Sequence, residues 1–252
     1  MPYSATWFDT FLPADDPPPV DREIAFVRRH LPLPDHRRVL DVACGVGRHA
    51  RALAPHGYEV LGIDRSGAAI RAAREGAPDG ARFLVHDLRD LDALEGEAFD
   101  AVLCLWQSFG AAEEDDGAVL AAMTRRLRPG GRLLLDVYHR QALARLPTEE
   151  REIRRGREVR TIRTLEGDRY RVRLSYSDSG DRDEFEWRVF TPEELAAEGA
   201  ACGLSPLLAC AWFDVDIPAS AEHVRMQLLF ERADGAPPDQ GAHAVDGGRA
   251  RS

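Results

Sequence analysis

Residues 39–50 read Val-Leu-Asp-Val-Ala-Cys-Gly-Val-Gly-Arg-His-Ala, an apolar strand that passes through Asp41 into a glycine pair and then a helix. A second apolar stretch, residues 58–63, is followed directly by another acid, Asp64. Glycines let a backbone approach a ligand closely, and an acid at the end of the next strand can accept hydrogen bonds from ribose hydroxyls. Together the two segments predict a nucleoside-binding site at the edge of an α/β sheet.

The alternation of strands and helices continues along the chain. Further strands are predicted at 82–85, 99–105 and 132–137, and helices at 21–31, 48–55, 66–75 and 115–127. A tight turn at 129–131 leads into the fifth strand. A helix that begins after Thr191, followed by strands at 206–213 and 223–231, completes the pattern. We therefore expect an α/β fold: a doubly wound, seven-stranded, mostly parallel sheet.

Residues 157–190 have a different pattern, in which polar and apolar side chains alternate. This predicts an antiparallel β insertion after the fifth strand, with one wet face. Its arginines are interleaved with acids, which favours solvation of the exposed face over a basic patch. The expected parts are an N-terminal aromatic lid segment (1–20), a cofactor-binding core (21–140), the insertion (141–190), a C-terminal helix with the last two strands (191–232) and a disordered tail (233–252).

Composition limits the classes of function. The 252 residues carry a formal net charge of −10 and contain no lysine. A Schiff-base lysine is therefore excluded, and a nucleic-acid substrate is disfavoured because phosphates need a positive field. The four cysteines lack metal-ligand spacing, so we expect reduced thiols and no metal. No signal peptide or membrane span is predicted, which indicates a soluble, cytoplasmic protein.

The kind of nucleotide is decided by the acids. The run Gly45-x-Gly47-x-x-Ala50 satisfies a loose dinucleotide fingerprint. However, Asp41 lies at the strand end, where it would repel a pyrophosphate but would suit a cationic amino-acid group. Asp87 follows the third strand, where it could accept a hydrogen bond from an adenine amino group. Both features disfavour a nicotinamide or flavin dinucleotide.

In the segments 39–50, 62–66, 99–105 and 127–136, and in Asp87, the chain resembles class I S-adenosylmethionine-dependent methyltransferases. The resemblance covers about residues 20–232 and implies a Rossmann-like methyltransferase fold, with S-adenosylmethionine as cofactor and S-adenosylhomocysteine as product. Residues 44–50, 108–110 and 190–195 are similar to bacterial small-molecule methyltransferases. Sugar and glycine-type N-methyltransferases also carry β insertions after the fifth strand, which either form a homodimer or cover the substrate. The sequence leaves both roles open.

The resemblance also implies roles for individual residues in cofactor binding. Asp41 and Gly45 would contact the methionine part and Asp64 would hold the ribose diol, while Asp87 and Leu88 would flank adenine. Leu105 would cover the sulfonium side. Some roles have alternatives: Asp64 or Asp87 could instead be a helix-capping or loop acid, and an N-terminal aromatic could pack on the core instead of forming a lid. Arg65 could face solvent, and Arg48 could pair with a nearby acid. The expected cofactor-binding residues are Tyr3, Trp7, Asp41, Ala43, Gly45, Arg48, Asp64, Arg65, Asp87, Leu88 and Leu105.

Methyl transfer from a sulfonium is an in-line displacement, so the protein mainly positions the acceptor and excludes water. Open α/β sheets bind ligands outside the carboxyl ends of their strands. His139, after the fifth strand, is the candidate general base, with a solvent-facing loop histidine as the alternative. The expected acceptor-binding residues are Trp106, Gln107, Phe109, Tyr138, Arg140 and, from the insertion, Trp187, for which core packing is the alternative.

Three functions follow from these observations. The first is methyl transfer to an oxygen or nitrogen atom of a small molecule. The second is a protein that binds S-adenosylmethionine without methyl transfer, as a regulator or in other sulfonium chemistry. The third is an NAD-dependent oxidoreductase, which the acid after the third strand makes less favourable. The acidic charge and the absence of a separate recognition domain argue against a macromolecular acceptor.

Overall fold

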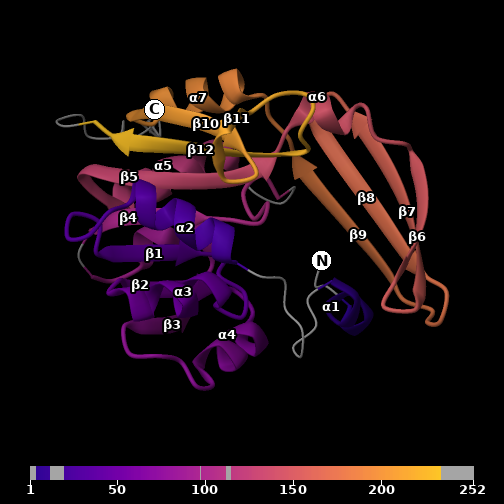
Figure 1. The fold of residues 1–252 in the computed structure, drawn as a ribbon, viewed down its shortest axis with the longest axis horizontal. Helices are drawn as coiled ribbons and strands as arrows, with labels where there is room; N and C mark the ends of the chain where they lie inside the picture. The colour runs from indigo at the N-terminus through magenta and orange to yellow at the C-terminus, as the bar shows by residue number, and fades with distance from the viewer. Residues whose placement is uncertain (1–3, 12–19, 97, 112–114, 234–252) are drawn as a thin grey trace, which may run out of the picture.

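The structure is a computed structural model that describes residues 4–11, 20–96, 98–111 and 115–233. A large sheet flanked by helices forms one part, and a smaller sheet stands beside it (Figure 1). Helix α1 (Ala5–Phe11) lies near the free end of the smaller sheet, against which its aromatic side chains pack. No helix in the described part of the chain is long and apolar enough to cross a membrane.

The large sheet has eight strands in the order β11-β10-β12-β5-β4-β1-β2-β3. Strands β1 to β5 pair in parallel, and β10, β11 and β12 are joined to them by antiparallel pairs. Because β1 lies between β2 and β4, the chain order reverses there, which is where such sheets bind ligands. The strands are β1 (Arg38–Val42), β2 (Glu59–Asp64), β3 (Ala81–Val85), β4 (Phe99–Cys104), β5 (Leu127–Tyr138), β10 (Leu204–Ala211), β11 (Asp214–Pro218) and β12 (Arg225–Arg232).

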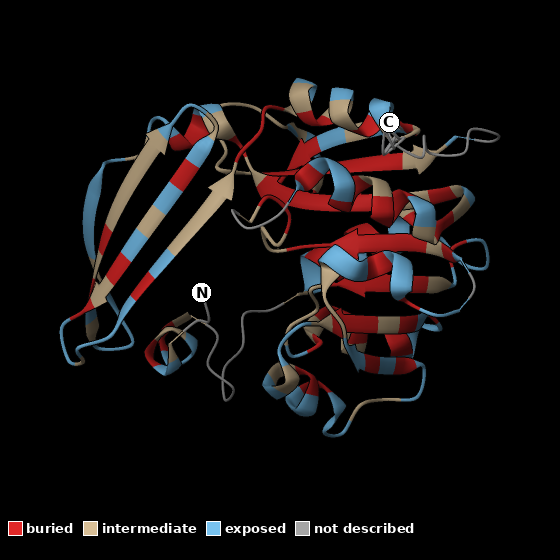
Figure 2. Cartoon of the chain, turned by 180° about the vertical axis from the view of Figure 1, so that it is seen from behind, coloured by how far each residue is buried: buried red, intermediate tan, exposed pale blue. Residues whose placement is uncertain are grey.

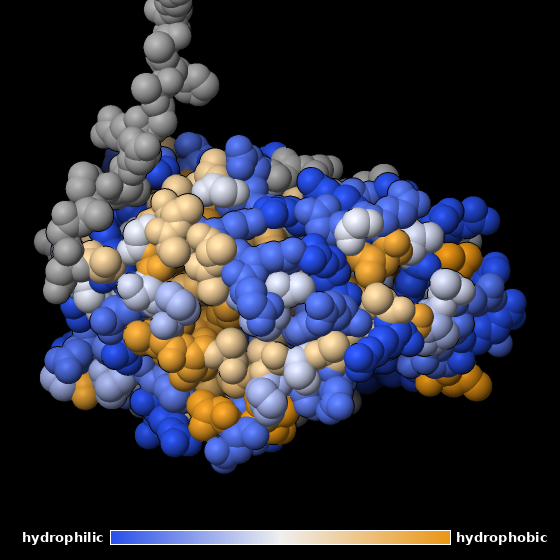
Figure 3. Space-filling view, turned by 90° about the horizontal axis from the view of Figure 1, so that it is seen from above, coloured by the Kyte–Doolittle hydropathy of each residue, from blue (hydrophilic) through white to orange (hydrophobic). Residues whose placement is uncertain are grey.

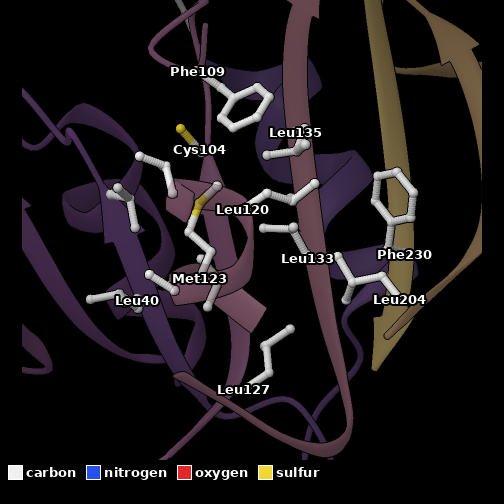
Figure 4. Close-up of a cluster of buried hydrophobic side chains, with 14 of the residues drawn as sticks. Leu40, Cys104, Phe109, Leu120, Met123, Leu127, Leu133, Leu135, Leu204 and Phe230 are labelled. Atoms are coloured by element: carbon white, nitrogen blue, oxygen red, sulfur yellow. The ribbon is translucent and has the colours of Figure 1, made fainter. Parts of the chain in front are cut away.

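The central strands of this sheet are buried along most of their length (Figure 2), and helices cover both faces because these strands are apolar on both sides. Along β1, Val39 packs with one set of helices and Leu40 with the other. Figure 4 shows Leu120 and Met123 packed near Leu133 on the second face. The first face carries α2 (Asp21–His30), α3 (Arg48–Leu53) and α4 (Gly67–Arg74); the second carries the 3₁₀ helix η2 (Leu88–Ala93), α5 (Asp116–Arg126) and α7 (Pro192–Ala201).

The smaller sheet is antiparallel, in the order β6-β7-β8-β9, and confirms the predicted insertion. Its outer face carries a ladder of ion pairs such as Arg160–Glu149 and Arg171–Glu186. The prediction that arginines solvate this face is therefore confirmed, and Figure 3 shows mainly hydrophilic residues over this end of the molecule. The strands are β6 (Glu149–Arg154), β7 (Arg157–Glu166), β8 (Arg169–Tyr176) and β9 (Arg182–Arg188).

The predicted mostly parallel, doubly wound sheet is confirmed, with eight strands in place of seven. The extra strand, β11, forms a hairpin with β10 through a two-residue turn at Trp212 and Phe213, both with positive φ. The tight turn expected at 129–131 is a bulge within β5, since Leu127 pairs with Phe99 and Arg132 with Ala101. The predicted helix start is confirmed by a capping box at Thr191.

Strand β6 was not predicted. Its sequence, Glu-Glu-Arg-Glu-Ile-Arg, offers no apolar alternation because it is an exposed edge strand whose charges pair across to β7. Short helices η1 (Ala54–His56) and α6 (Arg140–Leu143) complete the described elements. The expected disordered tail lies outside the described residues, apart from its first residue, and so do Tyr3 and most of the proline-rich end of the N-terminal segment.

Candidate functional site

The loop between β1 and α3 has a left-handed backbone at three positions. Ala43, Gly45 and Gly47 have φ values of +56°, +55° and +75°. A side chain at Gly45 would meet no atom within 4 Å, whereas a Cβ at Gly47 would lie 2.5 Å from Phe83. The first glycine therefore leaves open space for a ligand, and the second lets the loop pack against β3. Ala43 has a Cβ atom, so its positive φ at the same turn is strained.

Asp64, at the end of β2, is joined directly to this loop. Its carboxylate accepts the Gly45 N–H at 2.9 Å through Oδ2 and the Ser66 N–H at 2.8 Å through Oδ1. Each carboxylate oxygen has further acceptor capacity, and the side chain is half-buried. This arrangement fixes the acid beside the open glycine and leaves it able to accept hydrogen bonds from a diol.

Asp41 lies beneath the loop and is only 2% exposed. Burial raises the pKa of Asp41 to about 7; the Ala50 N–H opposes this rise, the nearby Asp64 adds to it, and Arg48 opposes it. Its Oδ2 atom has no hydrogen-bond partner among the described residues. A buried carboxyl with an unpaired oxygen is suited to a cationic ligand group, which would supply both the charge and the hydrogen bond.

Asp87, after β3, has partners within the chain. Its carboxylate caps η2 through the Arg89 N–H at 3.0 Å and pairs with the Arg89 guanidinium at 2.9 and 2.6 Å. These hydrogen bonds lower the pKa of Asp87 to about 2. Of its neighbours, Leu88 packs against the core and Arg65 adds a favourable charge to Asp87. The adenine role of Asp87 stays a prediction, and its bonds to Arg89 compete with it.

The end of β4 forms a second left-handed turn, at Trp106 (φ +59°) and Gln107 (φ +55°). Guanidinium groups lie over the Trp106 ring, that of Arg48 at 4.3 Å and that of Arg225 at 5.2 Å from its centroid. The turn therefore lies beside α3, which carries Arg48 directly after the glycine loop. Leu105, just before the turn, is only 3% exposed and belongs to the core.

Two polar residues of this region were missed from the sequence. Asp136 of β5 and Gln227 of β12 are both fully buried and hydrogen bonded to each other, and Arg225 pairs with Asp136. The one available signal was an acid inside the apolar run Leu-Leu-Leu-Asp-Val-Tyr, since a buried acid needs a partner. Its charged partner, Arg225, lies 89 residues later in the chain, so the spacing of the sequence could not locate it.

Aromatic side chains connect the sheet edge with the insertion. Tyr138 meets Trp187 at a centroid distance of 5.3 Å, Trp187 meets Phe185 at 5.7 Å, and Phe185 meets Trp7 of α1 at 6.2 Å. Tyr138 and Trp187 thus lie together beside a small core cluster, and their role in acceptor binding stays a prediction. Trp7 packs on the insertion, with Phe185 and Val172 in the same cluster. Its role as a lid over a cofactor stays a prediction.

The remaining expected residues are not brought to this edge in the same way. Phe109 is 1% exposed and stacks on Phe190 within the core, and its role in acceptor binding stays a prediction. Arg140 pairs with Glu194 at the start of α7. His139 is 2% exposed, so the solvent-facing alternative is wrong, and burial lowers its pKa. In this buried position His139 would be neutral at neutral pH.

Comparisons with known proteins agree with this geometry. Residues 39–131 match a family described as a methyltransferase domain. The chain is 32% identical over 115 residues to glycine N-methyltransferase of Mus musculus and 33% identical over 122 residues to a ubiquinone biosynthesis O-methyltransferase of Xylella fastidiosa. These stretches cover 39% and 47% of this chain, and 39% and 48% of the relatives, so the chain spans less than half the length of either.

A solved structure extends the likeness over most of the chain. An amino pentose methyltransferase of Micromonospora echinaspora with bound S-adenosylmethionine is 27% identical and superposes with a TM-score of 0.64. The match covers 86% of this chain and 92% of that one. The resemblance to class I S-adenosylmethionine-dependent methyltransferases that the motifs indicated is confirmed.

Proposed function

We propose that this chain, whose residues 39–131 match a methyltransferase-domain family, binds S-adenosylmethionine and transfers its methyl group to an oxygen or nitrogen atom of a small molecule. The observation that supports this proposal best is the hydrogen bond from the Gly45 N–H to Asp64, next to the open space at Gly45. A single carboxylate holds the glycine loop and stays available to a ribose. The orphaned Oδ2 of Asp41 supports a cationic amino-acid group nearby. The residues present therefore fit this cofactor.

S-adenosylmethionine, when bound, supplies an activated methyl group on a sulfonium. The chain needs to orient an acceptor in line with it and to exclude water. Trp106 and Tyr138, at the ends of β4 and β5, lie where an acceptor would approach from the carboxyl edge of the sheet. Buried His139 is the proposed base for an acceptor that must lose a proton; its lowered pKa keeps the imidazole neutral and able to take one.

The relatives differ in the atom they methylate, as their names state: one acts on glycine nitrogen and another is an O-methyltransferase. The acceptor of this chain is therefore proposed only as a small molecule with an oxygen or nitrogen nucleophile. Cys44, Cys202 and Cys210 are not part of disulfides, which supports the proposed cytoplasmic location.

Two measurements test the function. Calorimetry should detect binding of S-adenosylhomocysteine and none of NAD. A screen of amine and hydroxyl acceptors should then detect S-adenosylhomocysteine formed from S-adenosylmethionine, with His139→Ala reducing the rate. Binding without turnover by any acceptor would favour a cofactor-binding protein, and binding of NAD alone would contradict the proposal.

The pKa of Asp41 predicts how cofactor binding depends on pH. The ionised carboxylate attracts the ligand ammonium, so affinity for S-adenosylhomocysteine should rise as pH increases through about 7 and then level off. The steepest change would be about tenfold per pH unit. Calorimetry from about pH 5.5 to about pH 8.5 measures it, and Asp41→Asn should flatten the curve.

A matched control comes from a second buried acid. Burial raises the pKa of Asp116 to about 6, but Asp116 lies in α5 and faces Arg188. Asp116→Asn should leave the pH dependence of binding unchanged.

The folding stability of the ligand-free protein should change with pH in the opposite direction to ligand affinity. Because the pKa of Asp41 is raised in the folded state, the stability that this group contributes below about pH 4 is lost as pH rises through about 7. Asp41→Asn should remove that loss, and an unaltered unfolding profile would contradict the assignment.

A further inference from the structure

Two left-handed turns without glycine lie at the carboxyl edge of the large sheet. Trp106 and Gln107 have φ values of +59° and +55°, and Trp212 and Phe213 have φ values of +58° and +55°. Bulky side chains rarely adopt this backbone region, and they stay in it only where the surroundings hold them. The two turns therefore need an external restraint.

Asp136 restrains the first turn by accepting hydrogen bonds from the backbone N–H groups of both Trp106 and Gln107. The Trp106 N–H donates to Asp136 Oδ2 at 2.9 Å, and the Gln107 N–H donates to the Asp136 carbonyl oxygen at 3.0 Å. The carboxylate also accepts the Gln227 amide at 2.7 Å and the Arg225 guanidinium. Asp136 has no exposed surface, and each of these donors fixes the orientation of its carboxylate.

Gln227 joins the second turn to the same group. Its Oε1 accepts the Phe213 N–H at 2.7 Å while its Nε2 donates to Asp136. The Arg225 guanidinium lies over the rings of both turns, 5.2 Å from the centroid of Trp106 and 6.0 Å from that of Phe213. Three side chains from two paired strands therefore hold both strained turns.

We propose that Asp136, Arg225 and Gln227 are positioning residues for methyl transfer, which hold the Trp106–Gln107 turn as the acceptor-side wall of the site. The inference rests on the proposed function. The location supports it: β4 is the neighbour of β1, so the turn follows the strand next to the glycine loop, and Arg48 at the start of α3 contacts Trp106. A buried ionic group is a weak source of net stability compared with apolar packing, so specificity of geometry is the better account of its presence.

The test uses Trp106 as its own reporter. The chain has four tryptophans, so replacing Trp7, Trp187 and Trp212 by Phe leaves Trp106 as the one emitter. Asp136→Asn presents an amide N–H₂ to a ring of donors, so the turn should loosen. Trp106 emission should then move to longer wavelength and become more accessible to acrylamide. Asp183→Asn is the matched control and should leave the emission unchanged. Asp183 is a buried acid of β9 in the insertion, hydrogen bonded to Tyr176 of β8 and to Ser4 just before α1.

Binding and turnover separate positioning from general damage. In Asp136→Asn the affinity for S-adenosylhomocysteine should be retained, while kcat/KM for an acceptor found in the screen should fall about 100-fold, as expected for a misplaced acceptor. Adding Gln107→Gly should restore the Trp106 emission, because glycine adopts a positive φ without strain. If Asp136→Asn does not fold, Gln227→Met removes the neutral member of the group and is read in the same way.

Each outcome is decisive. Unchanged Trp106 emission in Asp136→Asn or, should that variant not fold, in Gln227→Met would overturn the proposal. Loss of S-adenosylhomocysteine binding together with the emission change would also overturn it, because the turn would then belong to the cofactor side. If the unaltered chain fails to bind S-adenosylhomocysteine, the proposed function fails instead, and the emission result still reports on the turn.

Discussion

Asp64→Asn is expected to weaken S-adenosylhomocysteine binding roughly 100-fold, because a charged acceptor of two hydroxyl hydrogen bonds contributes about 3 kcal/mol. The Gly45 N–H and Ser66 N–H now share the two carboxylate oxygens of Asp64. An amide offers only one accepting oxygen, so its N–H₂ group would face either the loop or the ligand. The change would therefore disturb the loop as well as the diol contact. Calorimetric titration measures the loss.

Two controls define this result. Asp92→Asn removes an exposed acid that pairs with Arg125, and it should leave binding unchanged. Asp87→Asn is the informative comparison, because its carboxylate is already bonded to Arg89. We expect it to cost about tenfold or less, as for one neutral hydrogen bond. If Asp64→Asn bound as tightly as the unaltered chain, the ribose assignment would be contradicted.

The sequence was sufficient where function depends on local spacing. Asp41, Gly45 and Gly47 lie within seven consecutive residues, and Asp64 follows at the end of the next strand, so one strand–loop–helix–strand unit defines their arrangement. Parallel pairing of β1 with β2 then brings Asp64 to the loop without any further long-range information. The fold class followed from the same local patterns.

The unpredicted features depend on pairings distant in sequence. The buried group of Asp136, Arg225 and Gln227 requires the antiparallel register of β12 on β5, which no local motif specifies. Phe109 is a second example: its position just after the fourth strand did not indicate that its ring is buried against Phe190, which lies far away in the sequence. Strand β6 was not predicted because its stability comes from cross-strand ion pairs and backbone pairing, which leave no apolar pattern in the sequence.

Gly47→Ala is expected to destabilise the protein severely. At φ +75° an alanine is strained, and its Cβ would lie 2.5 and 2.6 Å from two carbons of the Phe83 ring. Phe83 is buried, so the ring cannot move away freely. Backbone strain and overpacking together should cost about 3 kcal/mol. For a chain of this length the Tm should fall by roughly 10 °C, as thermal unfolding without ligand would measure.

Gly45→Ala is the matched control, because it changes the same loop at a similar φ without a clash. With nothing within 4 Å of the added Cβ, the cost should be about 1 kcal/mol and the fall in Tm a few degrees. The added methyl group would instead occupy the space that the proposed ligand needs, so S-adenosylhomocysteine binding should be lost from a folded protein. The pair thus separates the two uses of glycine in one loop: Gly47 serves packing and Gly45 serves ligand approach. Equal losses of stability in both variants, or unimpaired binding by Gly45→Ala, would refute that division.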